Sequence, residues 1–294
     1  MIIVRLSGGL GNQLFQYAFG RKLAVERNQK LMLDISLYEE MKTRTYKLDS
    51  LNICADIASN AEILTFTRRA HRDIISLGFR FFQRCIPYYK RLRFFEQSFV
   101  YDPNVSYIGK SVYLKGSWQS EKYFLPIRNI LRAELTPKTP IEREYISFAE
   151  SITSSNSVSL HVRRGDYVMN PRINDKHGTC SVSYYQDAVK LMNERLPSAK
   201  YYIFSDDLEW AQSNLDFIQN KQIIFHVPDV LNADAQEMWL MSQCKHHIIA
   251  NSSFSWWGAW LSNNPSKIII CPQKWFSNSP HSTKDLIPGS WVQL

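Results

Sequence analysis

The chain has 294 residues, 45% of them hydrophobic, and this length suits two folded domains of about 150 residues each rather than a disordered chain. Its five cysteines are widely spaced and form no CxxC pair, which excludes a disulfide framework and a cysteine zinc site and favours a reducing compartment. The net charge of +8 is unevenly distributed, and no apolar run approaches the roughly 18 residues that a membrane span needs.

A glycine-rich turn follows the first predicted strand, residues 2–6. It contains Gly8, Gly9 and Gly11, and Asn12 is the predicted N-cap of the next helix. The glycines allow a ligand to approach the backbone, and the free amides of a helix start favour an anion. With Asp34 after the next strand, residues 30–33, the pattern also fits a dinucleotide-binding oxidoreductase. Leu14, however, stands where that fingerprint needs its third glycine.

A basic segment lies between Arg68 and Arg93. Eight Lys and Arg residues accompany a single acid, Asp73, and aromatic residues are interleaved. Two interpretations remain open: the solvated face of an amphipathic helix, or peripheral contact with an anionic membrane. No recognised reader motif accompanies the segment, so we expect no nucleic acid partner.

A domain boundary is predicted near residues 136–156. Pro137 and Pro140 follow a predicted helix at 121–131, and a polar helix at 142–153 leads into the next strand. We therefore divide the chain into domains 1–155 and 156–294. The first begins as strand-helix-strand and becomes irregular after residue 60. In the second, strands are predicted at 201–204, 223–227, 247–250 and 268–270, and helices at 184–194, 208–215, 233–243 and 256–261. This alternation is typical of a parallel α/β sheet.

The strand at the start of the second domain ends in two arginines. Because side chains alternate along a strand, His161 and Arg163 share one face, and Arg164 points to the other. Ligands of α/β sheets bind at the carboxyl ends of strands, and the arginine fork suits phosphate oxygens. The alternative interpretation is a surface salt bridge between Arg164 and Asp166.

Polar residues also follow two later strands of this domain. Asp206 and Asp207 can accept hydrogen bonds from a base or ribose or orient a histidine, although either can instead cap the next helix. Asn251, Ser252 and Ser253 precede another helix and form a candidate phosphate site. For two of the nearby tryptophans, Trp256, Trp257 and Trp260, we expect core packing.

Four motifs in order give a more specific indication. They are residues 8–18 (GGLGNQLFQYA), 116–124 (GSWQSEKYF), 161–167 (HVRRGDY) and 251–258 (NSSFSWWG). Together they resemble the α-1,2-fucosyltransferases of glycosyltransferase family 11. The resemblance implies a GT-B-like α/β fold of two Rossmann-type domains facing a cleft. It also implies GDP-fucose as donor, with no metal or other cofactor. The N-terminal domain would face the acceptor, and the C-terminal domain would bind the GDP-sugar.

The resemblance also implies roles for individual residues. Arg163 would bind the β-phosphate of GDP-fucose, with His161 near the guanine and Asp206 or Asp207 orienting His161 or binding the base. Arg164, Asn251, Ser252 and Ser253 complete the implied donor site, and the serines would meet the diphosphate. The glycine loop, Gly8 to Asn12, would lie near the phosphates and the acceptor. Asp166 is the nearest candidate for the catalytic base, and a salt bridge to an arginine is its alternative role.

The predicted function is therefore inverting transfer of L-fucose from GDP-fucose to the 2-hydroxyl of a galactoside in surface-glycan synthesis. The partners are GDP-fucose and an oligosaccharide or lipid-linked acceptor. We expect a cytoplasmic enzyme with peripheral contact to the inner face of the membrane. Two alternatives remain: an oxidoreductase built on Gly9 and Gly11, and a non-catalytic protein that binds anionic ligands or a membrane surface through the basic segment.

Overall fold

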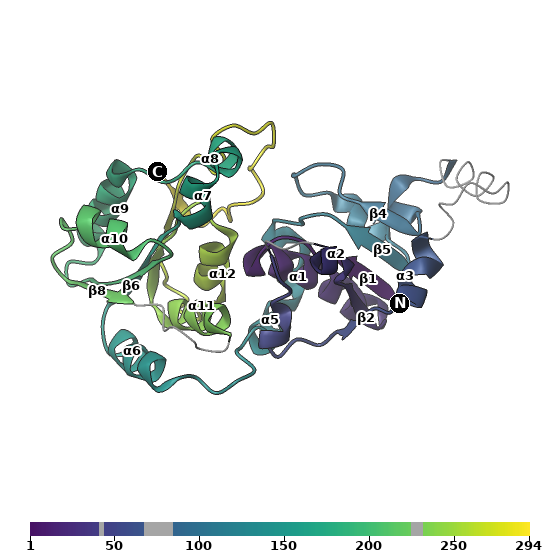
Figure 1. The fold of residues 1–294 in the computed structure, drawn as a ribbon, viewed down its shortest axis with the longest axis horizontal. Coiled ribbons are helices and arrows are strands. Elements are labelled where there is room, and N and C mark those ends of the chain that lie inside the picture. Colours follow the sequence, from purple (N-terminus) through teal and green to yellow (C-terminus); the bar gives the residue numbers. More distant parts are fainter. Residues whose placement is uncertain (41–43, 68–84, 225–231) are drawn as a thin grey trace. The chain divides into compact units, whose positions relative to one another are not determined.

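The computed structural model describes residues 1–40, 44–67, 85–224 and 232–294. The chain forms two compact units (Figure 1). Unit 1 comprises Met1–Leu135 with His281–Ile287, and unit 2 comprises Thr136–Pro280 with Pro288–Leu294. Most of the basic segment, residues 68–84, and the end of the strand predicted at 223–227 lie outside the described residues.

Unit 1 is built on a parallel sheet in the order β3-β2-β1-β5-β4. Its strands are β1 (Ile2–Arg5), β2 (Leu31–Asp34), β3 (Asp56–Ile57), β4 (Arg93–Phe95) and β5 (Val112–Lys115), and its helices are α1 (Leu10–Arg27), α2 (Ser36–Glu40), α3 (Asn60–Thr67) and α5 (Arg128–Glu134). The central strand β1 is apolar and almost fully buried, as expected for a strand covered on both faces.

Helix α1 starts two residues before the predicted N-cap. Gly9, not Asn12, is the N-cap, and Asn12 lies in the first turn. The reason is Gly8, whose left-handed backbone (φ +78°) turns the chain into the helix at once. The apolar stripe of α1 faces the core, since Phe15, Ala18, Phe19 and Leu23 are completely buried.

Unit 2 contains a second parallel sheet, in the order β11-β10-β9-β6-β7-β8. Its strands are β6 (Ser157–Val162), β7 (Lys200–Ser205), β8 (Lys221–Ile224), β9 (His246–Ile248), β10 (Ile269–Cys271) and β11 (Val292–Gln293). Its helices are α6 (Arg143–Thr153), α7 (Gly165–Met169), α8 (Pro171–His177), α9 (Val182–Arg195), α10 (Leu208–Asn214), α11 (Ala233–Gln243) and α12 (Ser253–Leu261). The prediction of two α/β domains with parallel sheets is confirmed.

Helices cover both faces of this sheet. Val158, Leu160 and Val162 of β6 pack with residues of α9 and α10 in one core cluster. The opposite face carries Tyr202 and Phe204, which pack with α6 and α11 in a second cluster. Because α6 belongs to this second core, the division at 135/136 precedes the predicted boundary at 155/156.

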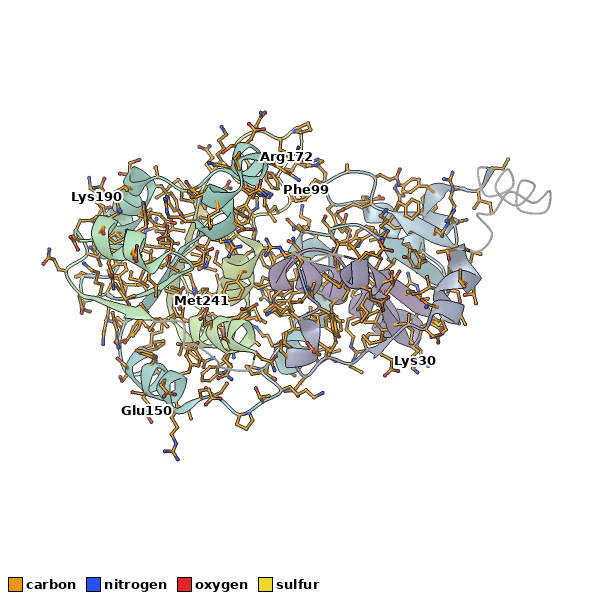
Figure 2. The ribbon with its side chains drawn as sticks, viewed as in Figure 1. Lys30, Phe99, Glu150, Arg172, Lys190 and Met241 are labelled. Atoms are coloured by element: carbon orange, nitrogen blue, oxygen red, sulfur yellow. The ribbon has the colours of Figure 1, made fainter. Side chains whose placement is uncertain are left out.

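Helices α11 and α12 pack very closely. Met241 of α11, labelled in Figure 2, lies against the Cα of Gly258, where a Cβ would collide with its sulfur. Trp256, Trp257 and Trp260 of α12 are all at most 1% exposed, so all three belong to the core, one more than predicted. Among the helices of the described residues, we find none that is both long and apolar enough to cross a bilayer.

Candidate functional site

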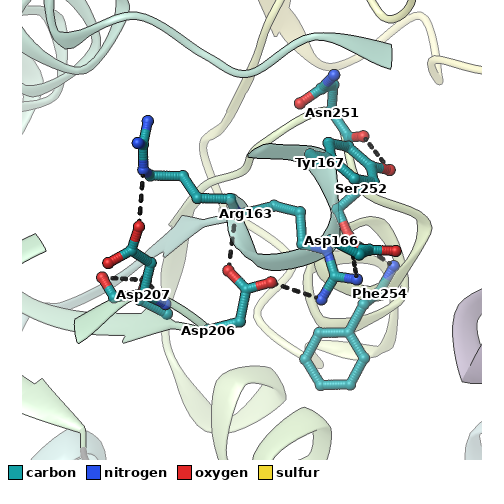
Figure 3. Close-up of polar contacts among 10 residues, drawn as sticks. Arg163, Asp166, Tyr167, Asp206, Asp207, Asn251, Ser252 and Phe254 are labelled. Atoms are coloured by element: carbon teal, nitrogen blue, oxygen red, sulfur yellow. Dashed lines mark hydrogen bonds and ion pairs between the residues drawn. The ribbon is translucent and has the colours of Figure 1, made fainter. Parts of the chain in front are cut away.

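The carboxyl edge of the unit 2 sheet holds a cluster of charged side chains around Arg163. Strands β6 and β7 are parallel, with Val162 opposite Ser205, so the next residues, Arg163 and Asp206, leave the sheet side by side. Arg163 Nη1 lies 2.8 Å from Asp206 Oδ2, and Nη2 donates to Asp166 Oδ1 at 2.5 Å (Figure 3). The guanidinium is therefore held between two carboxylates.

Two neighbours adjust the position of this arginine. A Cβ on Gly165 would lie 2.6 Å from Asp206 Oδ2, so the glycine allows the carboxylate to approach. Helix α7 then places the ring of Tyr167 5.4 Å from the Arg163 guanidinium carbon, within the range of a cation–π contact. Since Arg163 has five N–H donors, these ion pairs leave others for an anionic ligand.

Arg164 points away from Arg163, as the strand alternation predicts. Its Nε donates to Asp207 Oδ2 at 3.0 Å, and its guanidinium carbon lies 4.5 Å from the Trp210 ring centre. Asp207 also caps α10 by accepting from the Trp210 backbone amide, and Asp206 accepts from the Arg164 amide. The acids thus hold the two arginines. In the described residues neither carboxylate is hydrogen-bonded to His161, which was one of the two roles expected of them, and the other role, binding the base, stays a prediction.

His161 is buried directly beneath this edge. It is 5% exposed, and its ring centre lies 5.8 Å from that of Phe254 in α12. Burial, assisted by the positive charge of Arg163, lowers the pKa of His161 to about 3. Its Nδ1 has no hydrogen-bond partner among the described residues. His161 is therefore a neutral side chain at working pH.

The start of α12 opens at the same edge, because β9 lies next to β6 in the sheet. Ser252 is the N-cap, and its Oγ accepts from the Phe254 amide at 3.3 Å. Ser253 begins the helix and is partly exposed. The amides of a helix start and a nearby arginine are suited to an anion.

Asn251, the third predicted residue of this turn, forms hydrogen bonds within the protein. It is 2% exposed, and its Nδ2 donates to the carbonyls of His177 (2.9 Å), Gly178 (3.3 Å) and Trp275 (3.2 Å). The Asn251 side chain therefore fixes the segments beside the site, and its predicted contact with the donor stays a prediction.

Three aromatic residues of this site had no role predicted from the sequence. Tyr167 and His177 stack with ring centres 4.9 Å apart, and Trp210 supports Arg164. Burial lowers the pKa of His177, and its Nδ1 has no partner within the described chain. The sequence does contain a signal for the start of α8, the helix that ends at His177: Asn170 is its N-cap, and Pro171 is its first residue. The stacking itself depends on tertiary contacts.

In unit 1, the glycine loop is braced by amide side chains. Gln13 Nε2 and the Tyr38 hydroxyl each donate to the Gly8 carbonyl at 3.0 Å, and Gln16 bonds both the amide and the hydroxyl of Ser7. Asp34, the acid of the candidate dinucleotide fingerprint, is 1% exposed and accepts from the Tyr113 hydroxyl at 2.6 Å. It is thus committed to the core, unlike a ribose-binding acid.

A second loop of unit 1, residues 116–120, is held in an uncommon conformation. Trp118 has φ +54° although it is not glycine, which costs on the order of 1–3 kcal/mol. The Glu96 carboxylate accepts from the amides of Ser117 (2.6 Å) and Trp118 (3.0 Å). Gln119 Nε2 then donates to Asn12 Oδ1 at 2.8 Å, which joins this loop to the glycine loop.

Comparisons with known proteins agree with this architecture. The profile described as Glycosyl transferase family 11 matches residues 1–294. The chain is 38% identical to an alpha-1,2-colitosyltransferase of Escherichia coli, covering 100% of this chain and 99% of that protein. It is 29% identical to the Escherichia coli O-antigen biosynthesis glycosyltransferase WbnK, covering 98% and 99%. The fold is similar to that of an Arabidopsis thaliana FUT1 variant in complex with GDP (TM-score 0.54, 13% identity, 99% of this chain and 75% of that one).

Proposed function

Since the chain belongs to glycosyltransferase family 11, we propose that it is an inverting α-1,2-fucosyltransferase using GDP-fucose. The acceptor is the 2-hydroxyl of a galactoside in a surface glycan such as O-antigen. The observation that carries the proposal is the Arg163 guanidinium, fixed by Asp166 and Asp206 at the carboxyl edge of the unit 2 sheet. The family match favours this function over the two alternatives suggested by the glycine loop and the basic segment.

The donor side of the proposed mechanism concerns the leaving group. As the bond between fucose C1 and the β-phosphate oxygen breaks, its electron pair goes to GDP, and negative charge grows on the phosphate. Arg163 and the first amides of α12, beside Ser252 and Ser253, stabilise this charge. We propose that these fixed positive groups replace a divalent metal ion, and that no other cofactor takes part.

On the acceptor side, the 2-hydroxyl oxygen attacks C1 from the face opposite GDP, and its proton is released to solvent water. Inversion converts the β-linked donor into an α-fucoside. Asp166 already binds Arg163 at 2.5 Å. This contact supports a role in positioning the arginine over a role as the base.

A second donor has specific support. The 38% identical relative is named for colitose, which is fucose without its 3-hydroxyl. Both sugars leave from C1 and present the same 6-methyl group, so the proposed phosphate site serves either. We retain fucose as the proposed donor and colitose as the alternative.

Binding measurements test the donor site before any acceptor is identified. GDP should raise the melting temperature of the protein, and Arg163→Ala should reduce that shift. NAD should give no shift, because Asp34 and Leu14 do not provide a dinucleotide site. A shift with NAD but none with GDP would contradict the proposal.

A further inference from the structure

The contact between Gln119 and Asn12 fixes the orientation of an amide in the glycine loop. Gln119 Nε2 donates to Asn12 Oδ1 at 2.8 Å, across 107 residues of sequence. Asn12 is half-buried, and its Nδ2 packs against the Cα of Gly8. Within the described residues, Asn12 Nδ2 donates to no protein group. The oxygen of this carboxamide is therefore occupied, whereas its two N–H donors are available.

The loop that carries Gln119 is held from behind by a half-buried acid, Glu96. Glu96 follows β4, and its carboxylate accepts from the amides of Ser117 and Trp118. Burial raises the pKa of Glu96, and these two hydrogen bonds oppose that rise. A Cβ on Gly116 would lie 2.5 Å from Glu96 Cβ, so the acid and the loop are in close contact.

The indole of Trp118 secures the same loop. It is completely buried, with its ring centre 4.5 Å from that of Phe19 and 5.5 Å from that of Phe94. This packing and the Glu96 carboxylate together maintain the left-handed backbone at Trp118. Gln119, the next residue, is thereby directed to the glycine loop.

We propose that Gln119 is a positioning residue of the glycosyl-transfer reaction, supported by Glu96, and that it holds Asn12 so that its Nδ2 donates to an oxygen of a bound substrate. This inference rests on the proposed function for the identity of the substrates. Two sources of that oxygen share this chemistry: a phosphate or sugar oxygen of the donor, and a hydroxyl of the acceptor glycan.

The kinetic test compares Asn12→Asp, Gln119→Met and the double variant. The carboxylate introduced by Asn12→Asp can still accept from Gln119 but cannot donate, so turnover should fall about 10²-fold, the scale for removing one stabilising donor. Gln119→Met keeps the side-chain length and should lower turnover about 10-fold alone and less than 2-fold in the Asn12→Asp background. A rise in KM for the nucleotide sugar assigns the oxygen to the donor; a rise in KM for the glycan assigns it to the acceptor.

Equal effects of Gln119→Met in both backgrounds would overturn the inference, as would near-normal turnover of Asn12→Asp. Leu131→Ala, a buried residue of α5, serves as a control for lost stability and should leave both KM values unchanged. If Gln119→Met does not fold, the turnover of Asn12→Asp still tests the inference. This variant should fold, since Asn12 is only half-buried.

A measurement without turnover separates this inference from the proposed function. The ¹⁵N heteronuclear NOE of the Asn12 side-chain amide, assigned by its absence in Asn12→Asp, should match that of the rigid backbone. It should fall in Gln119→Met. An unchanged NOE in Gln119→Met would show that Gln119 does not fix Asn12, whatever the substrates are.

Discussion

Arg163 and Asp206 follow the ends of two adjacent parallel strands, and their charged groups lie 2.8 Å apart. The carboxylate of Asp166, three residues after Arg163, forms an ion pair with the other terminal nitrogen of the guanidinium, Nη2. The guanidinium is thus oriented by the protein before any ligand arrives. Preorganised charge of this kind is effective in catalysis because little reorganisation is needed as the reaction proceeds.

Arg163 should be the most sensitive residue of unit 2. Arg163→Ala should reduce turnover roughly 10²–10³-fold or more, because it removes a fixed donor from the leaving phosphate. Arg163→Lys should also be severe, since a single ammonium cannot reach both carboxylates and the phosphate with a planar fork. Steady-state kinetics on variants with native circular dichroism would measure these losses.

Arg164→Ala is the matched control for that experiment. The Arg164 guanidinium contacts Asp207 and Trp210 on the other side of the strand, so its loss should be milder. Near-normal turnover of Arg163→Ala would contradict the phosphate assignment. An equal loss of turnover in both variants would show that the two arginines do not act from opposite sides of the strand, and would leave the phosphate assignment of Arg163 in place.

His161 should make the protein less stable in acid. The pKa of His161 is about 3 in the folded protein and 6.5 for an ordinary histidine. As the pH falls, the unfolded chain therefore binds the proton at a higher pH than the folded chain does. The free energy of unfolding should therefore decrease as the pH falls from 6.5 towards 3, by about 2 kcal/mol between pH 6.5 and 5. Urea unfolding at pH 7.5 and 5 should show a smaller difference for His161→Leu than for the wild type. Equal differences would mean that His161 is not the source.

Asn251→Ala should destabilise unit 2 and weaken donor binding. It leaves three carbonyls without their shared donor, and an unsatisfied buried polar group costs roughly 1–3 kcal/mol. Urea unfolding measures the loss. Asn264→Ala is a control, since Asn264 is only partly buried and donates to a single carbonyl, that of Lys245. A loss no larger than that of this control would contradict the bracing role.

Removal of divalent metal should leave turnover unchanged. Arg163 and the start of α12 supply the positive charge that the diphosphate needs in the proposed mechanism. Activity in excess chelator is the measurement. Complete loss of turnover that is restored by magnesium or manganese would require a different account of the leaving group.

Local patterns predicted much of the fold and the identity of the charged cluster. The alternation of the predicted strand placed Arg163 and Arg164 on opposite sides, and the structure agrees, since Arg163 pairs with Asp206 and Arg164 with Asp207, although both arginines lie just after the end of β6. The predicted helix at 233–243 matches α11 residue for residue. The N-cap of α1 is Gly9 and not the predicted Asn12, because one left-handed glycine, Gly8, turns the chain into the helix earlier.

The sequence could not predict which groups pair. The pairing of Asp206 with Arg163, and not with His161, depends on strand register and on the close approach over Gly165. The roles of Asn251 and Gln119 depend on contacts with segments distant in sequence. The polar helix at 142–153 was correctly placed, but its partner in the second core could not be inferred from its own residues.

Transfer from a GDP-sugar to a β-galactoside, with the linkage of the product determined by NMR, tests the central claim most directly. The account predicts that GDP-fucose is consumed and that fucose appears α-linked to O2 of the galactose. Activity with a colitose donor alone would replace fucose as the donor and retain the linkage. A product linked at any other position, or no transfer from either donor across a panel of β-galactosides, would contradict the account.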